Sequence, residues 1–345
     1  MEDGEGAAER LARFLGPGVM AAFEDTDVTE VYLNPQDSRV RFDTRSRGKV
    51  ESDLQLPPQR VEMFLNAIAS HHDFRLDGDH PRLQAELPQR YFRGARLQAF
   101  LPPITVGPCF NVRKPPAVVY SLDEYVECGT LLPAWRRALR DAVAAHENIL
   151  VVGGTNTGKT TLANALIREI ADVCPGERVV ILEDTVELQC SASDHLALRT
   201  GAGLSLVDLV KSTLRTNPNR IIVGEVRDAS ALDLLDAWAT GHSGGVATLH
   251  ASTPAGALAR LDRLAQRANV PSQRALIAEA IHLVVILEGG NASRRISDVV
   301  RVTGLTSDGR YIITHCTESG AWIPAATLHV TPLPESSNLV VPFLS

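Results

Sequence analysis

The residues with the clearest chemistry run from Gly153 to Thr160 and read G-x-x-x-x-G-K-T, the spacing of a phosphate-binding loop. A mostly apolar run at 148–152 precedes the loop, and apolar residues at helical spacing follow it. In such a strand–loop–helix unit, backbone N–H groups turn inward around phosphate oxygens and the helix N-terminus adds positive potential. A glycine turn without a ligand is the alternative, but it requires neither the lysine nor the threonine. The pattern predicts a nucleoside triphosphate site.

Individual residues of this loop have different roles. In loops of this type the lysine, here Lys159, reaches the β- and γ-phosphates, and the hydroxyl of Thr160 ligates Mg²⁺. ATP and Mg²⁺ are therefore the expected cofactors. The residues of this segment predicted to bind the nucleotide are Gly153, Gly154, Thr155, Asn156, Thr157, Gly158, Lys159, Thr160 and Thr161.

Carboxylates follow the next apolar run, at 179–182. Glu183, Asp184 and Glu187 lie in the segment E-D-T-V-E, a composition that suits the positioning of Mg²⁺ and water. A charged loop that caps a helix would explain this segment equally well. Glu183 is the predicted catalytic and metal-positioning residue, holding the ion directly or through water.

A further carboxylate, Glu225, follows the strand-like run at 220–223. Many P-loop ATPases have Asp and then Glu at this point, and the Asp holds Mg²⁺ through water. Gly224 occupies the Asp position here, so Mg²⁺ positioning shifts to Thr160 and to Glu183 or Asp184. Glu225 is predicted to orient and polarise the attacking water.

Two histidines flank a glycine-rich segment. His242 precedes the apolar run at 246–249 and His250 ends it. At a strand end His250 can hydrogen-bond the γ-phosphate, and His242 is a second candidate for contact with the nucleotide. Taken alone, each histidine is more often a structural residue. Zinc binding is not indicated, because this segment has no cysteine and its spacing is not that of a helical pair.

The elements that must position these residues alternate as strand, helix, strand, helix across the second part of the chain. This order predicts an α/β fold with a mostly parallel sheet, helices on both faces, and the nucleotide at the carboxyl ends of the strands. Residues 133–345 are expected to form this domain.

The first part of the chain has a different pattern. Residues 1–113 carry short strand-like runs and a helical pattern over 58–71, which predicts a small α+β N-terminal domain. Lys114-Pro115-Pro116 then begins a predicted linker at 114–132.

Composition narrows the classes of function. The formal net charge of -7 argues against a protein that coats nucleic acid through bulk positive charge. Five scattered cysteines without a C-x-x-C pair suggest neither a disulfide framework nor a zinc ribbon, and reduced thiols fit the cytoplasm. The acidic residues 1–5 are unlike the start of a signal peptide. The apolar run at 283–287 is too short to span a bilayer. We expect a cytoplasmic protein whose membrane association is peripheral or through a partner.

On these motifs the chain resembles the traffic ATPases of type II and type IV secretion systems, with the closest match to the conjugal-transfer ATPases of the TrbB type. The resemblance covers residues 11–305. The P-loop, the Asp box at 182–187, the strand that ends in Gly224-Glu225 and the His box at 241–250 occur in the family's order. Gly224 matches the family, whereas Asn156 and Thr157 replace its usual glycine–serine pair.

The resemblance implies a RecA-like ATPase domain in a homo-oligomeric ring, expected to be a hexamer, that hydrolyses ATP. This ring would act with inner-membrane secretion or conjugation channel components to drive pilus assembly or substrate transfer. The resemblance also implies that arginines of the N-terminal domain and linker serve the nucleotide, often that of a neighbouring subunit. Arg96 and Arg113 fall at matching positions, and Arg220 and Arg227 are further candidates. The catalytic set is Lys159, Glu183, Glu225 and His250.

Three alternatives remain at this stage. A type II secretion or pilus-assembly motor often carries a cysteine-rich metal insert or a long docking domain, and this sequence shows neither. A DNA motor or recombinase is opposed by the acidic balance and by the lack of a basic–aromatic stripe. A non-catalytic, nucleotide-gated scaffold would not need both Lys159 and Glu225.

Overall fold

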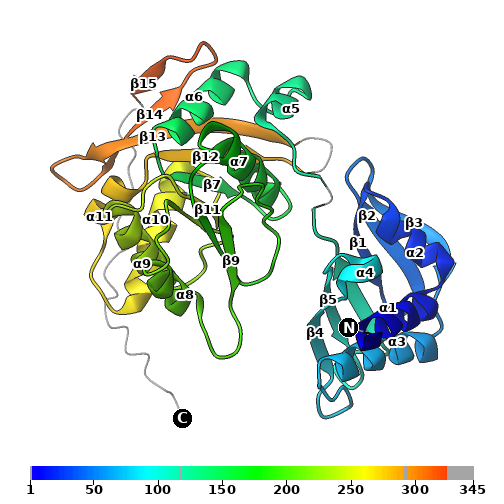
Figure 1. Cartoon of the computed structure of the whole chain (residues 1–345). Helices are drawn as coiled ribbons and strands as arrows, with labels where there is room; N and C mark the ends of the chain where they lie inside the picture. Colours follow the sequence, from blue (N-terminus) through cyan, green and yellow to red (C-terminus); the bar gives the residue numbers. More distant parts are fainter. Residues whose placement is uncertain (1, 117, 291–293, 325–345) are drawn as a thin grey trace, which may run out of the picture.

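The computed structural model describes residues 2–116, 118–290 and 294–324. Figure 1 shows two domains, an N-terminal one in blue to cyan and a P-loop domain in green to orange, joined by a single extended segment. Within the described residues, no helix has the length and apolar character needed to cross a bilayer.

The N-terminal domain is built on an antiparallel sheet with the strand order β3-β2-β1-β6-β5-β4. The burial of alternate residues in β5 and β6 shows that one face of the sheet is covered, and the helices supply the cover. The predicted helix over 58–71 is α3, so the predicted α+β domain is confirmed. The strands are β1 (Val28–Leu33), β2 (Arg39–Thr44), β3 (Gly48–Gln55), β4 (Arg82–Glu86), β5 (Arg96–Phe100) and β6 (Cys109–Arg113). The helices are α1 (Glu2–Leu15), α2 (Pro17–Glu24), α3 (Pro58–His71) and α4 (Gln89–Phe92).

The segment between the domains is shorter than the expected linker at 114–132. Helix α5 (Leu122–Glu127) begins at a capping box formed by Ser121 and Glu124. Its residues Leu122 and Tyr125 are buried in the core of the P-loop domain. The chain from α5 onward therefore packs as part of that domain, and α6 (Pro133–Ala144) follows.

The P-loop domain contains a 9-stranded sheet with the order β15-β14-β13-β12-β7-β11-β10-β8-β9. The strands from β12 to β9 pair in parallel, and β13 to β15 extend one edge by antiparallel pairing. The parallel strands are β7 (Ile149–Gly153), β8 (Val179–Glu183), β9 (His195–Arg199), β10 (Arg220–Val223), β11 (Val246–His250) and β12 (Leu283–Glu288). The antiparallel strands are β13 (Arg295–Leu305), β14 (Tyr311–Cys316) and β15 (Trp322–Pro324).

Successive residues of the central strand β7 enter different cores. Leu150 and Val152 pack in one hydrophobic cluster, whereas Ile149 and Val151 pack in the other. Because side chains alternate across a strand, the two clusters lie on opposite faces of the sheet. The predicted layered α/β fold is therefore confirmed. Its remaining helices are α7 (Lys159–Val173), α8 (Leu206–Thr213), α9 (Ser230–Ala239), α10 (Pro254–Ala265), the short 3₁₀ helix η1 (Gln266–Ala268) and α11 (Arg274–Ala280).

Candidate nucleotide-binding site

The motifs meet at one edge of the sheet because they follow neighbouring parallel strands. The P-loop follows β7, Glu183 ends β8, Glu225 lies just beyond β10 and His250 ends β11. In the pairing of β7 with β11, Gly153 lies beside His250. The carboxyl ends of these strands thus gather side chains from distant parts of the sequence.

The P-loop backbone explains its residue types. Asn156 has a φ of 61° and Gly158 a φ of 95°, both in the left-handed region. Asn is among the few residues other than glycine that adopt this conformation readily, so Asn156 keeps the loop shape of the family's usual glycine. Thr157 is buried, and its Oγ1 donates to the Gly154 carbonyl at 3.0 Å. A Cβ at Gly153 would lie 2.4 Å from that Oγ1, so only glycine fits at this position.

A chain of polar contacts joins the loop lysine to the predicted water-polarising residue. Lys159 Nζ donates to the Gly154 carbonyl at 2.6 Å and lies 3.3 Å from His250 Nδ1. His250 Nε2 lies 3.3 Å from Glu225 Oε1. Burial, with the charge of Lys159 in addition, lowers the pKa of His250, so the ring is neutral at pH 7. A neutral ring with its proton on Nε2 accepts from Lys159 and donates to Glu225.

The carboxylate of Glu225 is ionised in this setting. Burial opposes its ionisation, but the hydrogen bond and charge of Arg227, with the charge of Lys159 in addition, outweigh burial and lower its pKa. Arg227 also lies near Asp184 at 3.8 Å. An ionised carboxylate next to the phosphate site is suited to accept a hydrogen bond from water.

Thr160 pairs with Glu187, a carboxylate of the Asp box that the sequence did not assign to Mg²⁺. Its Oγ1 donates to Glu187 Oε2 at 3.0 Å. Arg96, from β5 of the N-terminal domain, binds Glu187 Oε1 at 2.9 Å and donates to the carbonyl of Thr185 at 3.1 Å. Arg96 Nε has no hydrogen-bond partner among the described residues. An arginine of one domain thus reaches the Asp box of the other within the same chain.

Glu183 occupies the space that an Asp at position 224 would need. A Cβ added to Gly224 would lie 3.0 Å from Glu183 Cγ. The Glu183 side chain is buried, and its Oε1 accepts the backbone N–H groups of Glu187 and Leu188 at 3.0 and 2.9 Å. Burial raises the pKa of Glu183 to about 7, despite these two donors.

A small polar cavity lies among these side chains and has room for an ion or a water molecule. Its volume is about 30 Å³. Carboxylate and hydroxyl oxygens are ligands that Mg²⁺ prefers, so the donor set fits that ion. The residues that line the cavity are Arg96, Thr160, Glu183, Asp184, Thr185, Glu187, Gly224, Glu225 and Arg227.

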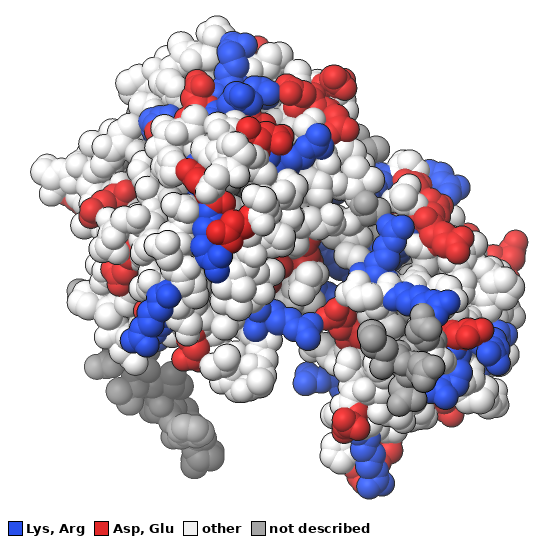
Figure 2. Space-filling view, viewed as in Figure 1, with Lys and Arg blue, Asp and Glu red and all other residues white. Residues whose placement is uncertain are grey.

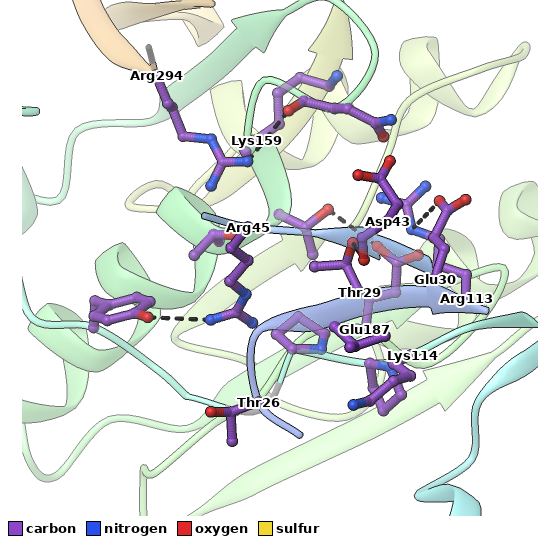
Figure 3. A pocket seen from close by; sticks show the side chains of 18 of the residues that line it. Thr26, Thr29, Glu30, Asp43, Arg45, Arg113, Lys114, Lys159, Glu187 and Arg294 are labelled. Atoms are coloured by element: carbon purple, nitrogen blue, oxygen red, sulfur yellow. Dashed lines mark hydrogen bonds and ion pairs between the residues drawn. The ribbon is translucent and has the colours of Figure 1, made fainter. Parts of the chain in front are cut away.

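A larger cavity of about 440 Å³ opens between the two domains, beside the P-loop. Its size is that of small-molecule sites in general. Figure 3 shows Lys159 and Arg294 of the P-loop domain together with Arg45 and Arg113 of the N-terminal domain around this cavity. Arg113 Nε lies 4.0 Å from Glu30 Oε1 and is half exposed. The N-terminal domain therefore completes the wall of this cavity, which is the candidate nucleotide site.

Two residues with contacts in this site were not singled out from the sequence. Arg294 donates to the Asn156 carbonyl at 3.3 Å, and its side chain crowds the position of a Cβ on Gly158. No motif surrounds Arg294, and the order of the strands alone brings it to the loop. Glu187 belongs to the quoted Asp box, but no spacing rule distinguishes it from Glu183.

Two sequence candidates lie elsewhere. His242 precedes β11, at the opposite edge of the sheet, and its Nδ1 is 3.2 Å from the Pro218 carbonyl. Arg220 opens β10 at that same edge and is fully buried. The structure does not bring either residue to the nucleotide site of its own chain, because each precedes its strand. A residue before a parallel strand lies at the edge opposite the ligand.

Comparisons with known proteins show which family the chain resembles. The sequence matches the family model for the type II/IV secretion system protein over residues 7–299. The conjugal transfer protein TrbB of Rhizobium radiobacter is 39% identical over 295 residues, which cover 86% of this chain and 90% of that protein. The type IV secretion system protein PtlH of Bordetella pertussis is 32% identical over 318 residues, covering 81% and 91%.

Solved structures add a likeness of fold. The pilus retraction motor PilT with bound ADP superposes with a TM-score of 0.61 at 18% identity, covering 84% of this chain and 83% of that one. The resemblance drawn from four motifs and the predicted fold are both confirmed. The chain therefore belongs to the type II/IV secretion system protein family.

Proposed function

We propose that this protein is an Mg²⁺-dependent ATPase that acts as a motor of a type IV secretion or conjugal-transfer system. The observation that carries hydrolysis is the contact series from Lys159 through His250 to Glu225. It couples the lysine expected at the terminal phosphates to the carboxylate expected at the attacking water. The transfer system is proposed because relatives that share most of their length with this chain are named for conjugal transfer and type IV secretion.

Each part of the site has a task in the proposed reaction. The backbone N–H groups of the P-loop and Lys159 bind the β- and γ-phosphates. Thr160, with Glu183 and Glu187, would hold Mg²⁺, which when bound offsets phosphate charge. Glu225 accepts a hydrogen bond from the attacking water and polarises it, while neutral His250 holds that carboxylate in place.

Arginines from the N-terminal domain would stabilise the charge that develops on the phosphoryl group. Arg96 already contacts the Asp box, and Arg113 lines the large cavity. A guanidinium aimed at the transferring group accelerates hydrolysis by orders of magnitude. Because these arginines sit on a separate domain, loss of the γ-phosphate would alter the contact between the domains. We propose that a ring of subunits, six by family resemblance, transmits this change from the cytoplasm to channel components at the inner membrane.

The decisive test is phosphate release by the variant Glu225→Gln. We expect turnover to fall about 100-fold or more, because a positioned general base contributes about that factor. Binding of a fluorescent ATP analogue should persist, since Glu225 does not belong to the P-loop. Glu279→Gln is the matched control, as Glu279 is exposed on α11. Turnover of Glu225→Gln at the parental rate would remove the assignment, and no affinity of the parent for Mg²⁺-ATP would remove the whole proposal.

The ring is tested separately by the mass of the purified protein in solution. We expect a multiple of the 37.3 kDa chain in the presence of ATP and Mg²⁺. A monomer under every nucleotide condition would contradict the ring and leave the hydrolysis proposal standing.

A further inference from the structure

We propose that His146, Cys174 and Glu177 form a binding site for a transition-metal ion of the zinc class. This site would lie on the P-loop domain, at the sheet edge opposite the nucleotide, and it does not depend on the proposed ATPase function. The three side chains offer one imidazole nitrogen, one thiol sulfur and one carboxylate oxygen, all within 4.8 Å of one another.

The fold brings these residues together from two neighbouring turns. His146 lies between α6 and β7, while Cys174 ends α7 and Glu177 precedes β8. Because β7 has 5 residues that each rise about 3.3 Å, the P-loop begins roughly 16 Å away. The cluster is therefore separate from the nucleotide site described above.

The distances suit a shared ion after small side-chain shifts. His146 Nε2 lies 2.8 Å from Glu177 Oε1. Ligands of a tetrahedral zinc ion, at about 2.0–2.3 Å from the metal, lie roughly 3.3–3.8 Å from one another. Side-chain rotations that move the three ligand atoms by about 1 Å bring their separations into that range. Three protein ligands leave one position for water.

The imidazole of His146 is accessible from solvent. His146 has a φ of 55° just after the end of α6, a left-handed conformation that histidine adopts more readily than most residues other than glycine. Its side chain keeps 41% of its surface exposed beside Glu177, so an ion can enter from solvent.

Arg220 holds the side chains of Glu177 and Cys174 in place by hydrogen bonds, as residues behind the ligands do at many metal sites. It is fully buried, its Nε donates to Glu177 Oε2, and Nη2 donates to Cys174 Sγ at 3.2 Å. The other carboxylate oxygen, Oε1, is thereby left on the side of His146. Arg220 orients the Glu177 carboxylate and the Cys174 thiol before any ion arrives.

The guanidinium charge also sets a limit on affinity. Arg220 donates to the carbonyls of Gly244 and Val143 at 3.1 and 3.0 Å, so backbone dipoles offset part of its charge. Binding of a divalent ion with loss of the Cys174 thiol proton adds one net positive charge to the cluster. We expect weaker binding than in a site built from cysteines alone, and one proton released per ion.

The ligand types select the metal. A thiolate with an imidazole favours Zn²⁺ and Co²⁺ over Mg²⁺ and Ca²⁺, which prefer oxygen ligands alone. The bound ion would tie the turn before β7 to the turn before β8, and so should raise the thermal midpoint of unfolding. The alternative is an ion-pair network that binds no metal.

The experiment is a titration of the full chain with Co²⁺ in excess Mg²⁺, which occupies the oxygen-lined nucleotide site. We expect a thiolate-to-cobalt absorption band that saturates at one equivalent and is displaced by Zn²⁺. Cys174→Ser should abolish the band, and His146→Asn, which tolerates the positive φ, should weaken binding at least tenfold. Cys128→Ser and Cys190→Ser are the matched controls and should retain it. Glu177 is left unaltered, because its loss would leave Arg220 buried without its carboxylate.

Several results would overturn the site. These are the lack of a sulfur–cobalt band, a band that survives Cys174→Ser, or a band lost in Cys190→Ser. Circular dichroism and thermal unfolding in chelator show whether Cys174→Ser folds as the parent does. If it does not, His146→Asn decides, because an affinity for Co²⁺ equal to that of the parent would contradict ligation by the imidazole.

Discussion

Glu183 has an unusual ionisation for a carboxyl group at a proposed Mg²⁺ site. Burial raises its pKa to about 7, so about half of the molecules carry a proton there at neutral pH. The folded state holds this proton to a higher pH than an exposed glutamate does. Its contribution to stability is therefore full at acidic pH and is lost as the pH rises through 7.

A cation in the adjacent cavity reverses this preference, because positive charge favours the carboxylate. We predict that Mg²⁺-nucleotide binding at pH 7 releases about half a proton more from the parent than from Glu183→Gln. Calorimetric titration in two buffers of different ionisation enthalpy measures the difference. The difference in proton release between the two proteins should be smaller at pH 8.5, where Glu183 is already ionised. Equal proton counts in the two proteins would place the ion elsewhere.

At the scale of elements, we propose that the ends of β8 and β10 together position Mg²⁺ and water, which one strand end does in many P-loop proteins. Glu183 ends β8, and its side chain fills the space next to Gly224, just beyond β10. The neighbouring strands are in parallel register, with Val223 beside Leu182. A carboxylate at position 183 or at position 224 can therefore reach the small polar cavity. The space beside Gly224 holds only one of these two side chains.

This geometry predicts a compensating pair of substitutions. Gly224→Asp alone should lower turnover at least tenfold, because its Cβ and second carboxylate crowd Glu183. Glu183→Ala alone should also lower turnover, since a buried carboxylate is lost. The double variant Gly224→Asp/Glu183→Ala should exceed both single variants in steady-state phosphate release. Gly78→Asp, at a glycine with nothing within 4 Å of its Cβ position, is the control. A double variant no better than either single one would refute shared positioning.

For the whole molecule, contacts between the domains concentrate on the Asp-box side of the sheet. Arg96 binds Glu187, and Arg199 binds Glu86 at 2.7 Å. Figure 2 shows basic and acidic side chains interspersed on the face in view, with a hollow where the domains meet. Arg96 is half-buried in this contact and faces the Asp box of its own chain.

We predict that Arg96 serves the site of its own subunit. Arg96→Ala should lower turnover at least tenfold, and mixed rings of Arg96→Ala with Glu225→Gln should stay as inactive as the separate proteins. Each subunit in such a mixture has one defect in its own site. Phosphate release by mixtures across several ratios, beside mixtures of parent and Glu225→Gln, is the measurement. Activity above the sum of the two variants would show that Arg96 acts on a neighbour.

Much of this protein could be predicted from local sequence. The P-loop, the capping boxes at Ser121 and Ser205, and the apolar run of β7 each depend on interactions within a few residues. Such short-range patterns fix the turn, the helix start or the buried strand in which they occur. They also fixed the edge of the sheet at which a nucleotide belongs, since all parallel strands end there.

Tertiary structure decided which side chains meet. Strand order and side-chain direction determine three features of the site. Thr160 contacts Glu187, Arg294 contacts the P-loop, and His242 lies at the opposite edge of the sheet. In the sequence, Cys174 is one of several scattered cysteines. In the structure, two neighbouring turns place it beside His146. Sequence patterns encode contacts that are near along the chain, whereas these contacts join segments whose proximity is a property of the packed sheet alone.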